Sequence, residues 1–434
     1  MKKTIILAAV LYCLFAIDAV AQVRIFSLDD CRKMALANNA KMRAARNEVT
    51  AAGEDKEYAF TKFFPTVSAT GTAYAANNPI VSVQLVQGLE LQYLQKGIVG
   101  GISAVVPIYS GGRIIAGNKL AAEGLSVKQL YLEQTENEVE LTAEQYFWQI
   151  VALESKLETV DTVGNMLDRL AVDVKAAVKA GVALRNDLLQ VELKQNNVAS
   201  TRINIRNNLT VCKMLLAQYM GIDSAAYELS AHVPMDATPP FPNNLRVDHS
   251  AALSQTPEYR LLEKNLEVNK LMYKDELGKN LPTVLVGGGF SYNNLIGGDH
   301  TNGMVFAGVN IPISGWWGGS HAMKKQKLKV ENAQMDLEDK SQQLLIRMKK
   351  AWIDVEDAYR QLEIARKSID QSAENLRLNR SYYAAGTSTM SSLLEALTLN
   401  QQSRDSYVDA FAAFRTKQLE YRQATATNRV VDTK

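Results

Sequence analysis

The chain contains one long motif twice, and this duplication restricts the possible folds more than any other feature of the sequence. Residues 281–313 alternate apolar with small or polar residues on both sides of a Gly- and Asn-rich loop at 293–302, which is the pattern of two β-strands with unlike faces. A similar hairpin spans residues 64–109, with a long loop expected at 76–99. It opens on FPTV where the other opens on LPTV, and it closes on VPI where the other closes on IPI. Two hairpins of one design predict a duplicated fold.

Each hairpin is followed by a long segment with helical spacing of apolar residues. These segments, 114–179 and 322–384, contain no proline. At 1.5 Å per residue the first would span about 99 Å, a length typical of a coiled coil or a helical tube. The remaining predicted helices are shorter and lie at 27–60, 186–220, 250–278 and 391–424. We call 186–220 and 391–424 the return helices, because each follows a long helix after a turn. The length of a return helix plus that of the helix before the next hairpin nearly equals the length of one long helix. Each repeat can therefore place one long helix beside two shorter helices stacked end to end.

The offset between the two copies is nearly constant. Trp148 corresponds to Trp352, and Gly181, which ends the first long helix, corresponds to Gly386. Glycine suits the left-handed backbone that ends many helices. A further turn is expected where the sequence reads GWWGG, at 315–319.

The first residues have the composition of a secretory signal peptide. A positively charged start precedes an apolar run at 4–17, and a small-x-small cleavage site ends at Ala21. The run is about fourteen residues long and Asp18 interrupts it, whereas a helix needs roughly 20 residues to cross a bilayer. We therefore expect an exported mature chain that begins at Gln22. The predicted organisation is a signal peptide (1–21), a first repeat (22–221), a Pro-rich linker (222–248), a second repeat (249–426) and a C-terminal tail (427–434).

Several functional classes are disfavoured by composition. The net charge is only +2 and no basic stripe stands out, which argues against a nucleic-acid partner. The four histidines are scattered, and GGGF at 287–290 is not followed by the helix start that a nucleotide site needs. Cys31 and Cys212 are far apart in the sequence and belong to no CxxC-like pattern, so we expect two buried or idle thiols and not a metal site or a disulfide framework. No catalytic, cofactor-binding or metal-binding residues are predicted.

The four predicted strands are too few to close a barrel. The smallest membrane barrels need about eight strands, so several chains would have to contribute to one barrel. Two chains would give a barrel of eight strands, three a barrel of twelve and four a barrel of sixteen. The alternation suits a barrel with a wet lumen: small apolar residues alternate with mostly polar or small ones. The apolar members are Val67, Ala69, Ala73, Val305, Ala307, Val309 and Ile311. The alternative for the strands is the edge of a soluble sandwich, although the rest of the chain is helical.

The order of these elements resembles the TolC family of outer-membrane efflux proteins. The resemblance covers nearly all of the mature chain and rests on the order and spacing of the motifs, twice over. It implies a mainly α fold with a membrane β-barrel, in which a homotrimer shares a twelve-stranded barrel in the outer membrane of a Gram-negative bacterium above a long α-helical periplasmic barrel. It further implies contact with outer-membrane lipid, a periplasmic adaptor protein and an inner-membrane pump. The two barrels together form an exit duct, which passively conducts drugs, toxins or proteins outward and needs no cofactor. The alternative is an elongated coiled-coil envelope protein or adhesin.

The resemblance also implies site residues at the two turns between long and return helices. Some family members carry two Asp residues on the second return helix, and their positions correspond here to Ser392 and Glu395, so one acid is kept. Asp187, beside Arg185, occupies the place of Ser392 in the first repeat. A ring of three Glu395 side chains would attract cations, and the alternative is a solvated surface acid.

One further role follows from the resemblance, and another follows from an aromatic pair for which the alternative is a ligand cage. The turns at Gly181 and Gly386 are where family members contact the adaptor. Trp316 and Trp317 are expected to anchor the barrel rim at the membrane interface, where indole rings are enriched.

Overall fold

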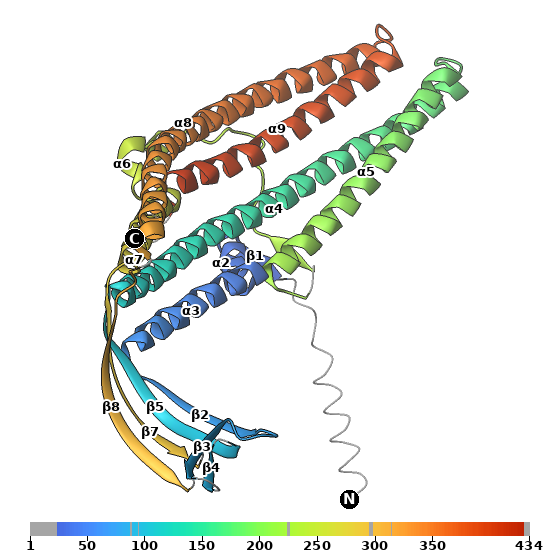
Figure 1. Cartoon of the computed structure of the whole chain (residues 1–434). Helices are drawn as coiled ribbons and strands as arrows, with labels where there is room; N and C mark the ends of the chain where they lie inside the picture. Colours follow the sequence, from blue (N-terminus) through green and yellow to red (C-terminus); the bar gives the residue numbers. More distant parts are fainter. Residues whose placement is uncertain are drawn as a thin grey trace, which may run out of the picture. The chain divides into compact units, whose positions relative to one another are not determined.

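The computed structural model of the protein describes residues 24–86, 89–93, 95–223, 226–294, 298–313 and 315–428. The expected signal peptide and most of the expected C-terminal tail lie outside these ranges. Figure 1 shows the helices and strands of the chain, which divides into two compact units. We call the unit made from residues 1–45, 133–256 and 344–434 the helical unit, and the unit made from 46–132 and 257–343 the strand-bearing unit. Each unit draws segments from both sequence repeats.

Eight α-helices are present in the described residues, and two of them are very long. They are α2 (Leu28–Asn38), α3 (Ala40–Phe60), α4 (Arg113–Lys179), α5 (Arg185–Met220), α6 (His249–Leu253), α7 (Pro257–Gly278), α8 (Gly315–Ala384) and α9 (Met390–Ala424). The long helices α4 and α8 have 67 and 70 residues, which confirms the lengths expected from the proline-free segments. Short 3₁₀ turns occur at Thr61–Phe63 and Asn243–Leu245.

The first predicted helix is broken in two at Asn39. Its start is a capping box, in which the Ser27 hydroxyl accepts from the amide of Asp30 at 3.2 Å and the Asp30 carboxylate accepts from the amide of Ser27 at 3.0 Å. At Asn39 the backbone is extended, and the side-chain oxygen accepts from the Lys41 amide at 2.8 Å. An Asn side chain that caps the next helix competes with continuous helix, so the prediction of a single helix over 27–60 was wrong.

The helix predicted at 250–278 is also interrupted. Pro257 begins α7, and proline is tolerated at a first helical position but not in a helix interior. The turn predicted at 315–319 was wrong as well, because α8 already begins at Gly315. Gly319 has a packing role there, since a Cβ at this position would lie 2.0 Å from the side-chain oxygen of Asn280.

Four long strands form one antiparallel sheet in the order β2 (Thr66–Ala75), β5 (Lys96–Ser110), β7 (Thr283–Asn293) and β8 (His300–Asn310). The two predicted hairpins are therefore joined edge to edge through β5 and β7, in a register that places Ile102 opposite Phe290. The expected loop at 76–99 contains a further antiparallel hairpin of β3 (Val81–Val86) and β4 (Leu89–Tyr93), so the expectation of an irregular loop was wrong.

The Pro-rich linker between the repeats is mostly irregular, as its prolines predict. It contributes one short strand, β6 (Tyr227–Leu229), which pairs in parallel with β1 (Arg24–Phe26) near the start of the described chain. The hydroxyl of Tyr407 on α9 donates to the carbonyl oxygen of Pro234 at 2.8 Å and holds the linker against this helix.

The core of the helical unit consists of two apolar clusters. One is rich in aromatic side chains and contains the buried Trp148 and Trp352, the residues that correspond between the repeats. Cys31 and Cys212 lie in the same cluster as buried free thiols, as expected from their spacing. The second cluster lies toward the turns that end α4 and α8, and its side chains come from α4, α5 and α9, among them Val191 of α5.

Candidate channel wall and helical tips

The strand register places one set of apolar side chains, drawn from all four strands, on the same face of the sheet. Val67 of β2 lies opposite Ala104 of β5, Ala69 lies opposite Ile102, and Val305 of β8 lies opposite Gly288 of β7. Because side chains alternate along a strand, one face carries the following residues: Val67, Ala69, Ala73, Ile98, Ile102, Ala104, Val286, Phe290, Val305, Ala307 and Val309.

The opposite face is more polar. The hydroxyls of Ser68 and Ser103, on neighbouring strands, are 3.0 Å apart and hydrogen-bonded. Thr70, Thr72 and Ser291 belong to the same face by register. By register this face also carries Val99, Leu285, Met304 and Phe306, so it mixes polar with apolar side chains, whereas the first face is predominantly apolar.

Glycines without room for a side chain shape the polar face. A Cβ at Gly101 would lie 2.7 Å from the carbonyl oxygen of Phe290, and one at Gly289 would lie 2.7 Å from that of Ile102. Both glycines line a shallow hollow of about 190 Å³ within the strand-bearing unit. Glycines at such positions let neighbouring strands bend and coil, as a barrel wall requires.

The sheet ends in two edge strands. Among the described strands, β2 pairs only with β5, and β8 pairs only with β7. Long edges of this kind present a row of backbone donors and acceptors to another chain. Both edges of the sheet therefore have backbone groups available for pairing with a further strand.

The two turns at the far ends of α4 and α8 have the same geometry. Gly181 and Gly386 have positive φ angles of 78° and 73°. At the first turn the amide of Val182 donates to the oxygen of Ala177 at 3.0 Å, and at the second the amide of Thr387 donates to that of Tyr382 at 2.9 Å. These are the long-range bonds of Schellman motifs, which require a left-handed residue at each glycine. The predicted role of both glycines as turn residues is supported by this geometry. We call the two turns the helical tips.

Asp187 and Ser392 occupy equivalent positions in the first turns of α5 and α9. The Asp187 carboxylate accepts from the amide of Leu184 at 3.3 Å, and the amide of Ser392 donates to the hydroxyl of Thr389 at 3.2 Å. Both residues therefore take part in helix capping. Together with burial, the negative charge of Asp187 raises the pKa of Tyr383 at the end of α8.

Arg185 and Glu395 are both exposed. In the described part of the chain Arg185 forms no ion pair with Asp187, and the Glu395 carboxylate has no hydrogen-bond or ion-pair partner. Glu395 is two residues from the buried Leu393, about 200° around the helix, so its side chain leaves α9 on the side away from the core. The candidates Asp187, Ser392 and Glu395 thus lie near the tips, but a single chain does not bring their side chains together.

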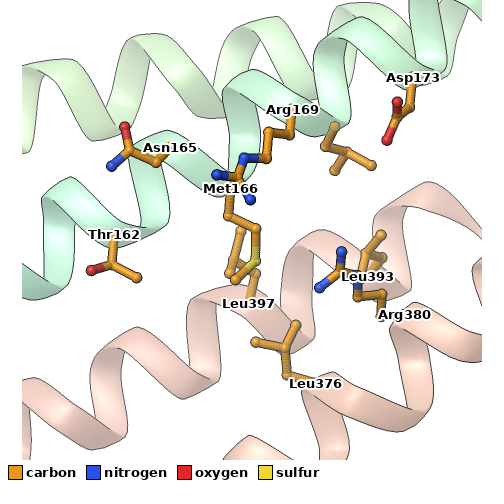
Figure 2. Close-up of a pocket in the computed structure, with 10 residues that line it drawn as sticks. Thr162, Asn165, Met166, Arg169, Asp173, Leu376, Arg380, Leu393 and Leu397 are labelled. Atoms are coloured by element: carbon orange, nitrogen blue, oxygen red, sulfur yellow. The ribbon is translucent and has the colours of Figure 1, made fainter.

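A groove that sequence reasoning missed lies between α4, α8 and α9 near the tips (Figure 2). It has a volume of about 360 Å³. Met166 reaches from α4 toward Leu397 of α9, while Arg169 of α4 and Arg380 of α8 are the cationic side chains of its walls. No local pattern could have predicted the groove, because its residues come from segments about two hundred positions apart.

Trp317 in the first turn of α8 is exposed, whereas the side chain of Trp316 lies outside the described structure. Within the described ranges, no helix combines the length and the apolar composition that a membrane span requires. The same residues contain no group of three or more His, Cys, Asp or Glu side chains placed to hold a metal ion.

Solved structures share this architecture at low sequence identity. The outer membrane protein VceC from Vibrio cholerae aligns at a TM-score of 0.75 and 13% identity, over 92% of this chain and 95% of that one. The CmeC outer membrane channel of Campylobacter jejuni aligns at 0.79 and 13% identity, over 92% and 85%. The open state of the Neisseria gonorrhoeae MtrE outer membrane channel aligns at 0.75 and 16% identity, over 92% and 88%. These likenesses show the fold, and two of the three aligned structures, CmeC and MtrE, are described as outer membrane channels.

The sequence itself matches a family model. No curated protein sequence matches the chain. The model of the outer membrane efflux protein family matches residues 31–221 and 257–427, which together make up most of both repeats. This match confirms the resemblance drawn from the duplicated hairpins and helices. The chain therefore belongs to the outer membrane efflux protein family.

Proposed function

We propose that this chain is one subunit of a homotrimeric exit duct in the outer membrane of a Gram-negative bacterium, which passively conducts drugs, toxins or other substrates outward. One observation carries the proposal: a four-stranded antiparallel sheet with one apolar face and two unpaired edges is joined to helices of 67 and 70 residues. Three copies supply twelve strands, enough for a closed barrel. Strand direction alternates through the sheet, so β8 of one copy and β2 of the next would be antiparallel.

The two faces of the sheet fit a barrel wall. The apolar face of Val67, Ile102, Phe290 and Val305 would contact outer-membrane lipid, and the polar face with Ser68 would line a water-filled lumen. The long helices would continue the duct into the periplasm, since 67 residues of helix span about 100 Å.

The helical tips are the proposed contact for a periplasmic adaptor, which would link the duct to an inner-membrane pump. Val182 is 80% exposed and Leu184 is 70% exposed, on either side of the turn that follows Gly181. Large apolar side chains this exposed on a turn are typical of a surface that a partner covers. The equivalent residues near Gly386 are Thr387 and Thr389, so the apolar contact belongs to the first repeat.

Glu395 is the proposed gate residue. Its carboxylate is exposed near the tips and is free of partners within the described chain. A threefold axis would gather three such carboxylates, and their mutual repulsion would favour cation binding. Asp187 and Ser392 are assigned a structural part, because both are engaged in capping.

The duct is tested by deletion and by single-channel recording. Deleting the gene should sensitise cells to several unrelated toxic compounds. Glu395→Ala should weaken block of the channel by divalent cations, because the ring loses its charge. Glu363→Ala is the matched control, as it removes an exposed acid of α8 about 30 Å from the tips. Unchanged block in Glu395→Ala would remove the gate assignment. Recovery of the protein as a soluble elongated rod, and not as a heat-modifiable trimer in the outer membrane, would overturn the proposal of an exit duct.

A further inference from the structure

The start of α8 carries positive charge that nearby acids do not balance. Residues 300–330 contain four lysines and no acidic residue. Counted from the prolines that close the two hairpins, Lys325 and Lys329 correspond to Leu120 and Gly124 of α4, so the duplicated fold does not require lysines there. We call the following exposed residues the lysine cluster: Lys324, Lys325, Lys327 and Lys329.

Ion pairs within the chain leave most of this cluster unneutralised. In the described part of the chain, Lys327 is the one member with an acidic neighbour, Glu331 at 3.9 Å. The cations beside the neighbouring strand ends differ, because Arg113 after β5 and Lys279 before β7 pair with acids of α7 at 3.3 and 2.7 Å. Three charges of the lysine cluster are therefore free to bind an anion outside this chain.

Exposed apolar side chains lie between the lysine cluster and the apolar face of the sheet. Val309 of that face is 65% exposed, Ile313 follows it at 63%, and Trp317 in the first turn of α8 is 79% exposed. Trp317 and Lys324 are seven residues apart, or close to two helical turns, so they share one side of α8. Along the chain, the apolar face of the sheet therefore leads to an indole and then to lysines.

The side chains of the cluster lean toward the sheet. Every Cα–Cβ bond of a helix tilts toward the helix N-terminus, and α8 begins at Gly315, five residues after β8 ends at Asn310. Lys324 and Lys325 lie about 10–12 Å of helix beyond Trp317, and their long apolar stems allow the ammonium groups to extend back toward an interface. The order of apolar face, indole and ammonium matches the order of hydrocarbon, interface and phosphate across one leaflet of a membrane.

We propose that the lysine cluster binds the anionic phosphodiester headgroups of phospholipids, in the leaflet at the helical end of the barrel. This inference rests on the proposed function, because it requires the sheet to lie in the outer membrane. Lys324 and Lys325 contact the phosphates, and each ammonium group offers three donors without a fixed geometry. Lys329 lies one further turn along α8 and adds to the attractive field, which extends about 8 Å at physiological salt. The contact fixes the depth of the barrel in the membrane.

The indole of Trp317 reports which lipid lies beside the cluster. The full-length protein is reconstituted in vesicles that contain either brominated phosphatidylglycerol, which is anionic, or brominated phosphatidylcholine, which is not, and quenching of tryptophan fluorescence is measured. Trp148 and Trp352 are buried in the core of the helical unit and give a constant background. The unaltered protein should prefer phosphatidylglycerol, and the preference should disappear at about 1 M salt, where the charges are screened.

Charge variants of the cluster test the assignment directly. Lys324→Gln with Lys325→Gln should lower the affinity for phosphatidylglycerol relative to phosphatidylcholine by about fivefold for each lysine removed. Lys324→Arg with Lys325→Arg keeps the charge and should keep the preference. Lys349→Gln with Lys367→Gln is the matched control, because it removes two exposed lysines of α8 that begin about 36 Å of helix beyond Lys325, and it should leave the preference unchanged.

The outcomes separate the lipid site from the duct. Equal quenching by both lipids, or a preference that survives the glutamine pair, would overturn the lipid site and leave the duct intact. An unchanged preference with a loss of anion selectivity in single-channel recordings of that pair would place the lysines in the lumen and also overturn the lipid site. Quenching by neither lipid would overturn the membrane placement on which the duct rests. If the glutamine pair does not assemble, the unaltered protein decides, because a preference that persists at high salt would overturn the lipid site.

Discussion

Lys194 of α5 donates a hydrogen bond to Thr398 of α9, and the two residues are 204 positions apart in the sequence. Trp148 and Trp352 have the same separation, so the two repeats meet at equivalent points of their return helices. Burial lowers the pKa of Lys194. The contact holds the first and second helical tips at one height, which a duct with a single flat end needs.

The tip glycines should resist substitution for reasons of backbone geometry. Gly386→Ala places a Cβ on a residue with a φ of 73° and should lower stability by roughly 1 kcal/mol. Gly117→Ala is the matched control, because Gly117 lies inside α4 and an added Cβ would meet nothing within 4 Å, and it should stabilise by about 0.5–1 kcal/mol. Thermal unfolding of the two variants in detergent measures the difference. A loss of similar size in both would contradict the role of the positive φ.

The buried carboxylate of Glu144 should be far more sensitive to removal than that of Glu356, which accepts from the other of the two corresponding tryptophans, Trp352. Glu144 is buried, accepts from the indole nitrogen of Trp148 at 2.9 Å and pairs with Arg32. Removing one partner of a buried ion pair leaves the other charge uncompensated, so Glu144→Ala should cost about 3 kcal/mol. Glu356→Ala, which removes the acceptor of Trp352, should cost about 1 kcal/mol. Equal midpoints of thermal unfolding would refute the distinction.

Substitution by alanine should impair assembly at one glycine of the sheet and have no effect at another. A methyl group at Gly101 would lie 2.7 Å from a backbone oxygen of the neighbouring strand, whereas one at Gly71 would meet nothing within 4 Å. Gly101→Ala should therefore reduce the yield of assembled protein in the outer membrane, and Gly71→Ala should not. Quantifying folded trimer by its heat-modifiable mobility compares them. Normal assembly of Gly101→Ala would show that the strands can separate to admit the side chain.

Asp405 on α9 should make stability depend on pH. Burial raises its pKa to about 6, with Lys156 of α4 opposing the rise and Asp409 adding to it, and Gln401 also lies beside it. The unfolded chain releases this proton near pH 4, before the folded chain does, so stability falls as pH rises from about 4 to 6 and stays low above that.

Asp405→Asn removes this penalty. The variant should gain stability relative to the unaltered protein at pH 7, by at most roughly 3 kcal/mol, and gain little at pH 4. Thermal unfolding at the two pH values measures the gain, with Asp357→Asn as the control because its side chain is 63% exposed and it is not one of the groups that shift the Asp405 pKa. An equal gain at both pH values would exclude Asp405 as the source.

The elements with strong local signals were predicted from the sequence. The long helices have no proline, the tips carry glycine, and Ser27 with Asp30 forms the expected helix start. The alternation at Val67 and Val305 also predicted which side chains share a face, although the register that joins both hairpins into one sheet was not derivable.

What was missed depends on packing or on weaker signals. The break at Asn39 comes from a side-chain cap that competes with a helix, and the two arginines of the tip groove, Arg169 and Arg380, meet only after folding. Residues 81–93 do alternate, so the β3–β4 hairpin carried a signal that was read as loop. At Asp187 the sequence signal was present but ambiguous. An acidic residue in the first turn of a helix is compatible both with a gate and with a helix cap.

The parallel pair of β1 and β6 imposes an order on folding. Arg24 lies opposite Tyr227, so the first strand of the described chain has no partner until about two hundred further residues have been synthesised. Contacts between such distant segments form late and slow the search for the native state. The amino-terminal strand therefore stays without its partner while the first repeat is completed, and its pairing is expected to be a late step of folding.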